Sequence, residues 1–259
     1  MTMISRTSSQ VVALAVLMTL ASCGGSKGGS TSTTKNPTTT PPQKPQEERQ
    51  MDEGIYRAVI KPLNASVASN ATSGNFIIKI SGDDVVVKGR ITGAPAGVMH
   101  RQQVRVLGSC PDASADKNAD GIIDARELKA SSGAILIPLD RDLSEQVSGI
   151  SFGPIANANG AYVYKSSTTL TRLLADLRDL DPDKQDDLVK LNPEHNLNLA
   201  DKQIVILGVG SETELPATVA GSEELSAAQA LPIGCGELVR ISREEEATVP
   251  VETPTVETL

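Results

Sequence analysis

The sequence predicts an all-β fold, an antiparallel β-sandwich or barrel with one or two short helices in inserted loops. Short apolar segments recur along the chain with polar turns between them, as in sandwiches and barrels. In several segments apolar and polar residues alternate, which is the period of a strand with one buried face. The predicted strands are 55–63, 75–80, 84–91, 98–107, 134–139, 161–164, 203–209 and 236–241.

The connections between these strands carry further local signals. A polar Ser-Gly-Asp-Asp turn at 81–84 separates the second and third strands and indicates a β-hairpin. Over 170–177, leucines recur at the spacing of one helix face, and the pattern ends at Asp181-Pro182. The leucines of this predicted helix are Leu170, Leu173, Leu174 and Leu177.

Residues 1–22 have the pattern of a secretory signal. Arg6 supplies the positive end, and the apolar run 11–20 is too short to span a bilayer as a mature helix. The Leu-Ala-Ser-Cys sequence that ends at Cys23 resembles the lipobox of bacterial lipoproteins. The resemblance implies cleavage before Cys23 and attachment of lipid to it. Ordinary secretion, with cleavage after a small residue, is the alternative.

Composition divides the rest of the chain into a tether, one domain and a tail. Residues 23–50 are rich in Gly, Ser, Thr, Pro, Lys and Gln without apolar periodicity, so we expect a disordered tether. Residues 51–242 have the length of a single domain. Residues 243–259 repeat Glu, Thr, Val and Pro and are expected to form a disordered acidic tail. Because Gly24 and not Asp follows Cys23, we expect the protein in the cell envelope at the outer membrane.

Charge and composition exclude several classes of function. The formal net charge is −8, and the chain has no Trp, three Tyr and two Phe. Nucleic-acid binding is therefore disfavoured, because the chain lacks a basic stripe and aromatic residues for base stacking. His100 and His195 are the only histidines. Neither has a Cys or Ser partner at a spacing that suggests a nucleophile, so we expect no enzyme.

The loop 116–127 resembles the calcium loop of EF-hand proteins. Its position 6 is Gly121, where that loop turns sharply, and Ile122 at position 7 would offer its backbone carbonyl. Side chains with oxygen atoms occupy positions 1, 3, 5, 9 and 12, which are Asp116, Asn118, Asp120, Asp124 and Glu127. A calcium ion takes six to eight oxygens at about 2.3–2.6 Å, and alternate residues of a tight loop can supply them. The alternative is an acidic surface loop without metal.

The flanks indicate a solitary loop inserted in another fold. Pro111 lies so close to the start of the loop that a full entering helix is not expected. An exit turn is predicted over 124–130, because it contains good helix formers and is followed by Ser131, Ser132 and Gly133. No second loop of this kind occurs in the chain.

Three groups of segments, in the same chain order, resemble copper-zinc superoxide dismutase. They are 85–93 with 97–105 and 108–110, then 203–207, and finally 234–238. The resemblance implies a Greek-key antiparallel β-sandwich or barrel. It also implies a disulfide between Cys110 and Cys235, the counterparts of the family's bridged cysteines.

The metal site of that family is absent. The copper histidines would fall on Gln103, Arg105 and Leu207, and the arginine that steers superoxide would fall on Pro232. Only His100 matches a family histidine, at a supporting position. We interpret His100 as hydrogen-bonded at a strand end and His195 as a solvated loop residue.

Three functional hypotheses follow from these patterns. The first is a membrane-anchored, non-catalytic lipoprotein whose calcium loop stabilises a disulfide-braced β-domain and which binds an unknown protein partner. The second is a remnant dismutase that holds one metal weakly through His100 and acidic residues. The third is a calcium-dependent adhesion module. The missing ligands separate the first hypothesis from the second, and no sequence feature separates the first from the third.

Overall fold

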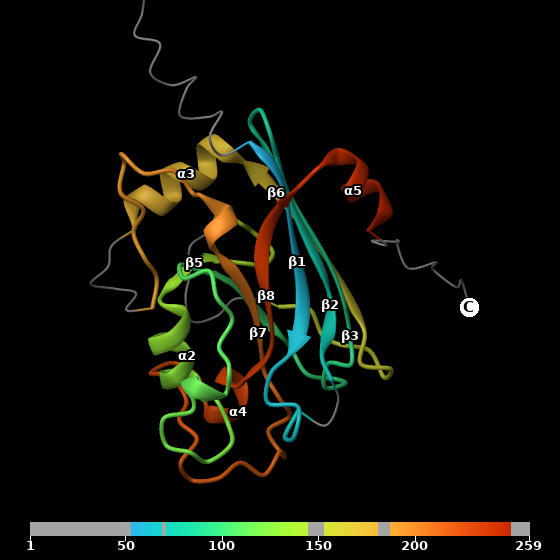
Figure 1. Ribbon diagram of the computed structural model, residues 1–259, viewed down its shortest axis with the longest axis vertical. Helices are drawn as coiled ribbons and strands as arrows, with labels where there is room; N and C mark the ends of the chain where they lie inside the picture. Colours follow the sequence, from blue (N-terminus) through green and yellow to red (C-terminus); the bar gives the residue numbers. More distant parts are fainter. Residues whose placement is uncertain (1–52, 69–70, 145–152, 181–186, 250–259) are drawn as a thin grey trace, which may run out of the picture. The chain divides into compact units, whose positions relative to one another are not determined.

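A computed structural model describes residues 53–68, 71–144, 153–180 and 187–249, which form an antiparallel sheet curled into a half-barrel (Figure 1). The eight strands are β1 (Gly54–Pro62), β2 (Ser73–Ser81), β3 (Asp84–Thr92), β4 (Arg101–Arg105), β5 (Ile135–Pro138), β6 (Tyr162–Thr169), β7 (Gln203–Leu207) and β8 (Pro232–Ile241). The all-β prediction is confirmed, and each predicted strand overlaps an observed one. The predicted signal, Cys23 and the predicted tether lie outside the described residues.

The strands follow the order β5-β4-β7-β8-β1-β2-β3-β6 across the sheet. β1, β2 and β3 follow one another in the chain and pair in that order, and β8 returns from the C-terminal end to pair with β1. The strands β8, β1, β2 and β3 thus have the 4-1-2-3 spatial order of a Greek key, with β4 to β7 inserted in the connection between β3 and β8. The sequence predicted β8 to begin only at Gly236, because the Pro, Gly and Cys residues of its first half do not alternate in polarity.

The open side of the half-barrel is bridged by side-chain hydrogen bonds from β6. The hydroxyl of Tyr162 donates to Oε1 of Gln102 at 3.1 Å, and that of Tyr164 donates to the carbonyl of Asp140 at 2.7 Å. Two residues further along β6, the hydroxyl of Ser166 donates to the carbonyl of Arg141 at 3.2 Å. The segment that follows β5 is therefore fastened to β6 without a backbone ladder.

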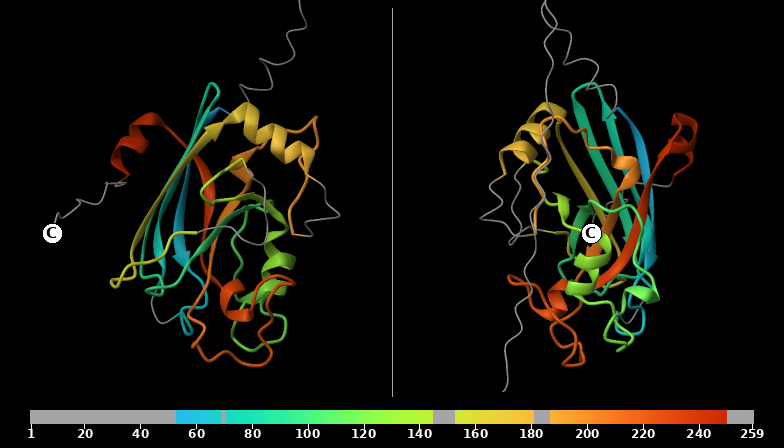
Figure 2. Two further views of the ribbon diagram at one scale, coloured as in Figure 1. Left: turned by 180° about the vertical axis from the view of Figure 1, so that it is seen from behind. Right: turned by 60° about the vertical axis from the view of Figure 1, so that its left-hand side comes forward.

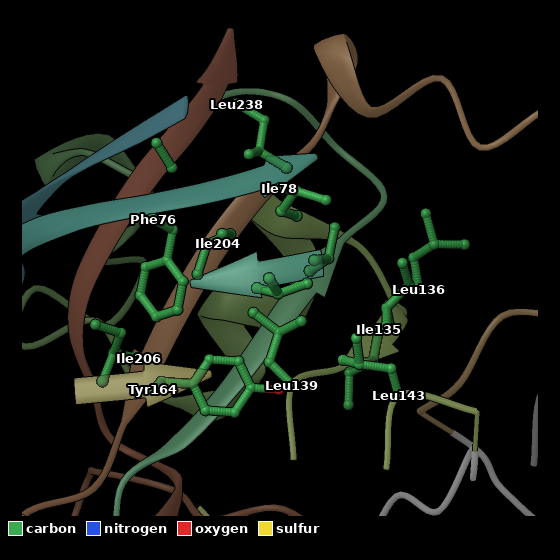
Figure 3. Packing of buried hydrophobic residues seen from close by; sticks show 14 of the residues in the cluster. Phe76, Ile78, Ile135, Leu136, Leu139, Leu143, Tyr164, Ile204, Ile206 and Leu238 are labelled. Atoms are coloured by element: carbon green, nitrogen blue, oxygen red, sulfur yellow. The ribbon is translucent and has the colours of Figure 1, made fainter. Parts of the chain in front are cut away.

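The inward residues of the strands form the main hydrophobic core (Figure 3). Phe76 is fully buried at its centre, with its ring 6.2 Å from that of Tyr164. Gly89 lies opposite Phe76 on β3, and a Cβ atom at Gly89 would lie 2.4 Å from the Phe76 ring. The ring therefore occupies space that exists only because residue 89 has no side chain.

The helices are short and lie in the connections. They are η1 (Ala113–Ala115), α2 (Ala125–Ser132), α3 (Leu170–Asp179), η3 (Leu199–Asp201), α4 (Ala227–Ala230) and α5 (Arg243–Thr248). The predicted leucine face is confirmed in α3, where Leu170, Leu173 and Leu177 are buried. None of the described helices has the length and apolar character needed to cross a membrane.

The prediction of a disordered tail from residue 243 is wrong for its first part. Residues 243–248 form α5, which lies apart from α2 and α3 (Figure 2). Ser242 and Glu245 form a reciprocal capping box, and Val249 packs on Ile55 and Ile77 of the sheet. Acidic composition suggested disorder, but a Ser-x-x-Glu cap followed by an apolar anchor favours a helix. Residues 250–259 lie outside the described part.

The contact between Phe76 and Gly89 can be tested by mutation. Gly89→Ala should lower the free energy of unfolding by about 1–3 kcal/mol, the usual cost of overpacking a core. Urea denaturation measures this change. Combining Gly89→Ala with Phe76→Leu should cost less than the sum of the two single changes, because the smaller side chain relieves the clash. Lys88→Ala, on the exposed face of the same strand, is the control. A Gly89→Ala protein as stable as wild type would contradict the packing.

Candidate calcium site

The predicted calcium loop lies in a long connection between β4 and β5 that covers the outer face of the sheet. Leu128 of α2 packs there against Val205 and Leu207 of β7 and against Cys235 of β8. The alternate residues of β7, Ile204 and Ile206, point into the main core. Both faces of β7 are thus buried, one by the core and one by this connection.

A disulfide fastens the start of this connection to the sheet. Cys110 is bonded to Cys235, 125 residues away, with their Cα atoms 5.8 Å apart. The pairing implied by the dismutase resemblance is confirmed. Six residues after Cys110 the loop 116–127 begins, so the bridge limits how far the loop can move from β8.

The first half of the loop turns around one backbone N–H group. The N–H of Asp120 donates to Oδ1 of Asn118 at 2.9 Å and to Oδ1 of Asp116 at 3.3 Å. The other oxygen of Asp116 accepts from the N–H of Gly121 at 2.8 Å. Gly121 has a φ of 83°, a backbone conformation that favours glycine. The side chains at positions 1 and 3 therefore both accept from backbone N–H groups of the turn.

The carboxylate of Glu127 closes the loop. Its Oε1 atom accepts from the N–H groups of Lys117 at 2.6 Å and Asn118 at 3.3 Å. Its Oε2 atom accepts from the N–H of Asp124 at 3.0 Å as part of the α2 capping box. Position 12 thus reaches back to positions 2 and 3, which brings the two ends of the loop together.

Asp124, at position 9, acts mainly as a helix cap. Its Oδ1 atom accepts from the N–H groups of Arg126 at 2.8 Å and Glu127 at 3.0 Å. Its Oδ2 atom accepts from the N–H of Ala220 at 2.9 Å. The exit helix is confirmed as α2, and only the three-residue η1 precedes the loop, as predicted.

Two contacts that sequence reasoning missed tie the loop to distant segments. Asn64, just after β1, accepts from the N–H of Ile123 at 2.9 Å and donates to its carbonyl at 2.8 Å. Its amide also donates to the carbonyl of Pro232 at 2.9 Å. The hydroxyl of Thr218 donates to Oδ2 of Asp120 at 2.6 Å, and this hydrogen bond lowers the pKa of Asp120. Neither residue belongs to a local motif that could have identified it.

The loop has the residue spacing and the sharp turn of a calcium loop, but its carboxylates do not all point to one common position. Within the described ranges, no group of three His, Cys, Asp or Glu side chains lies close enough together to hold a metal ion. The carboxylates of Asp124 and Glu127 are instead engaged with backbone N–H groups. An ion would have to replace some of these hydrogen bonds, so calcium binding stays a prediction.

The positions of the dismutase ligands also come together in the structure. Gln103, Arg105 and Leu207 line one cavity on the outer face of β4 and β7. The Oε1 atom of Gln103 accepts from Nε of Arg105 at 3.2 Å and from Nη2 at 3.1 Å. Pro232 begins β8, opposite Leu207. None of these four side chains is a histidine or a carboxylate.

His100 is a core residue with both ring nitrogens beside carbonyl groups. Nδ1 lies 3.3 Å from the carbonyl oxygen of Leu207, and Nε2 lies 3.0 Å from that of Pro95. The ring stacks on Tyr162 at 5.6 Å, and burial lowers the pKa of His100. The prediction of a hydrogen-bonded histidine at a strand end is confirmed, and the exposed His195 fits the expected loop position.

The chain matches no protein-family model, and no curated protein matches it. The resemblances to dismutase and to EF-hand loops therefore rest on the segments quoted above.

The disulfide should make a large contribution to stability. Replacing Cys110 and Cys235 together by Ser should lower the free energy of unfolding by about 2–5 kcal/mol, because the bridge restricts a long loop of the unfolded chain. Urea denaturation of both proteins measures the difference. Thiol labelling of the unreduced, unfolded wild type should modify neither cysteine. Labelling of both would contradict the bridge.

Proposed function

We propose that this chain is a lipid-anchored, non-catalytic calcium-binding protein of the bacterial outer membrane. In this proposal the loop 116–127 binds one calcium ion and stabilises the disulfide-braced β-domain. Asp116, Asn118, Asp120, Asp124 and Glu127 supply side-chain oxygens, and Ile122 supplies its carbonyl. An unknown protein partner would bind the domain so presented.

The observation that carries the proposal is the position of the loop between distant parts of the chain. Asn64 connects it to the end of β1, and Asp124 and Asp120 connect it to Ala220 and Thr218. Asp124 and Glu127 also form the capping box at the start of α2. An ion that fixed this loop would therefore fix three segments at once. This arrangement favours a structural role for calcium, in which the domain holds one conformation.

A single loop of this kind is expected to bind weakly. The affinity should fall at roughly 10⁻⁵ to 10⁻³ M, the range of weak sensors and extracellular modules. Binding would be weakened further because the ion must replace hydrogen bonds that Glu127 and Asp124 accept from backbone N–H groups. Millimolar calcium outside the inner membrane would still occupy about half of the sites at the weak end of this range and nearly all of them at the tight end.

At the positions that the resemblance assigns to the copper ligands, the residues present favour a non-catalytic protein over a remnant dismutase. Gln103 and Arg105 bond to each other, and both nitrogens of His100 lie beside backbone carbonyls. Binding of a redox metal by imidazoles would need several free histidine nitrogens in one place. We therefore expect neither tight copper or zinc binding nor dismutase activity.

Calcium should raise the melting midpoint of the wild-type protein. At a hundredfold excess over the dissociation constant, binding adds about 2.7 kcal/mol, which corresponds to roughly 5–10 °C for a domain of this size. The measurement is a melting curve with calcium, magnesium, copper, zinc or chelator. Magnesium should substitute poorly because it requires a smaller octahedral shell.

Glu127→Gln and Asp120→Asn should remove the calcium-dependent shift, and Glu194→Gln, an exposed carboxylate outside the loop, should retain it. The quantity to compare is the difference between the melting midpoints with calcium and with chelator for each variant. The midpoint alone is not sufficient, because loss of the Glu127 cap lowers it even without metal. A wild-type midpoint that calcium does not raise would show that the loop is only a turn.

Lipid attachment is tested separately from calcium. Cys23→Ser should move the protein from the membrane fraction to the soluble fraction, because the lipidated residue is lost. Cys110→Ser, which removes a different cysteine, should leave the partitioning unchanged. Fractionation followed by immunoblotting measures both variants. Unchanged membrane association of Cys23→Ser would contradict the lipoprotein interpretation.

A further inference from the structure

A cavity of about 600 Å³ lies beside the calcium loop, between the sheet and two surface segments. Its floor is formed by β4 and β7, one wall by α2, and the other wall by residues 221–225. The loop 116–127 holds both walls in place, since Asp124 caps α2 and also accepts from the N–H of Ala220. The volume is within the range of sites that bind small molecules.

The floor contains a buried cation, Arg105, that forms no salt bridge with a carboxylate of the described ranges. Arg105 is 6% exposed. Its hydrogen-bond partners are Oε1 of Gln103, which accepts from Nε and Nη2, and the carbonyl of Gly133, which accepts from Nη1 at 2.6 Å. A guanidinium has five N–H donors. Three are used, and one donor on each terminal nitrogen remains.

Burial makes this cation costly unless a ligand compensates it. Desolvation lowers the pKa of Arg105 to about 10, although the negative charge of Asp187, which also lines the cavity, opposes this change. The group is therefore still charged at neutral pH. An anion with two oxygens would satisfy both remaining donors in the bidentate geometry that guanidinium groups favour.

The rest of the lining selects among anions. Buried apolar side chains surround the floor: Leu128, Ile135, Leu207 and Ala230. At the exposed rim, Arg126 and Lys129 face Glu223 and Glu224, and Lys129 pairs with Asp187 at 2.6 Å. A rim of mixed charge gives no general attraction for polyanions, and the apolar side chains around the floor disfavour a fully hydrated phosphate.

We propose that this cavity binds a small carboxylate that carries an apolar group. The carboxylate pairs with the two remaining N–H donors of Arg105, and the apolar group packs against Leu128, Ile135 and Leu207. A purely structural role for Arg105, bonding Gly133 to β4, is the competing explanation. That role needs no ligand, so the two explanations differ in whether the cavity binds carboxylates.

The test is calorimetric titration of the full chain with acetate, butyrate and hexanoate, and with hexanamide and inorganic phosphate. The carboxylates should bind with affinity that increases with chain length. Hexanamide should bind at least tenfold more weakly than hexanoate, because it cannot pair with the guanidinium. Equal binding of hexanamide, tighter binding of phosphate, or no binding of hexanoate at millimolar concentration would overturn the proposal.

Two variants address the site from different sides. Arg105→Met removes the charge at similar length, and Ala125→Leu fills the cavity from α2 without changing Arg105. Both should weaken hexanoate binding at least tenfold, and Arg172→Gln on α3 should not. Far-ultraviolet circular dichroism checks that each variant is folded. Unchanged hexanoate binding by a folded Ala125→Leu protein would overturn the site even if Arg105→Met does not fold.

The variant Asp120→Asn distinguishes the carboxylate-binding proposal from the calcium proposal. This variant should lose the calcium-dependent shift in melting and keep hexanoate binding, because Asp120 does not line the cavity. Loss of hexanoate binding by Asp120→Asn in chelator would count against a site built on Arg105.

Discussion

The structure depends on the burial of β7, and of the first half of β8, on two faces. Every residue of β7 is buried, so the strand needs apolar or paired groups on both sides. The main core covers Ile204 and Ile206, and the connection from β4 to β5 must cover Val205 and Leu207. That connection has little regular structure of its own. The Cys110–Cys235 bridge, the α2 cap and the contacts of Asn64 together hold it on the sheet.

This requirement explains why polar and covalent interactions concentrate in one region. Leu128 is the main apolar contact of α2 with the sheet, and an eight-residue helix with so small a buried face is not stable alone. The capping box of Asp124 and Glu127 stabilises its first turn, and the same two residues belong to the candidate calcium loop. An ion in the loop would therefore directly stabilise the connection between β4 and β5 that forms the outer layer of the domain. The cavity on Arg105 lies at the boundary of that layer.

Much of the fold is encoded locally and was predictable. Alternation around Phe76, Val85 and Val104 indicated strands because one face of each lies in the core, and the leucines of α3 indicated a helix for the same reason. The disulfide followed only from a family resemblance, because spacing does not reveal that Cys235 lies beside Cys110. Asn64 and the cavity could not be predicted, since both depend on contacts across more than fifty residues. The short helix α5 was missed because acidic composition outweighed its cap.

The pairing of β1 with β8 sets the order in which the protein can fold. β8 lies in the middle of the sheet but is the last strand in the chain. One edge of β1 therefore has no partner until nearly the whole domain has been synthesised or exported. The thiol of Cys110 must also wait for Cys235 on that same strand. Contacts of such large sequence separation make folding slow. Whichever strand pairs form earlier, the sheet and the disulfide can therefore be completed only in one late step, after β8 becomes available.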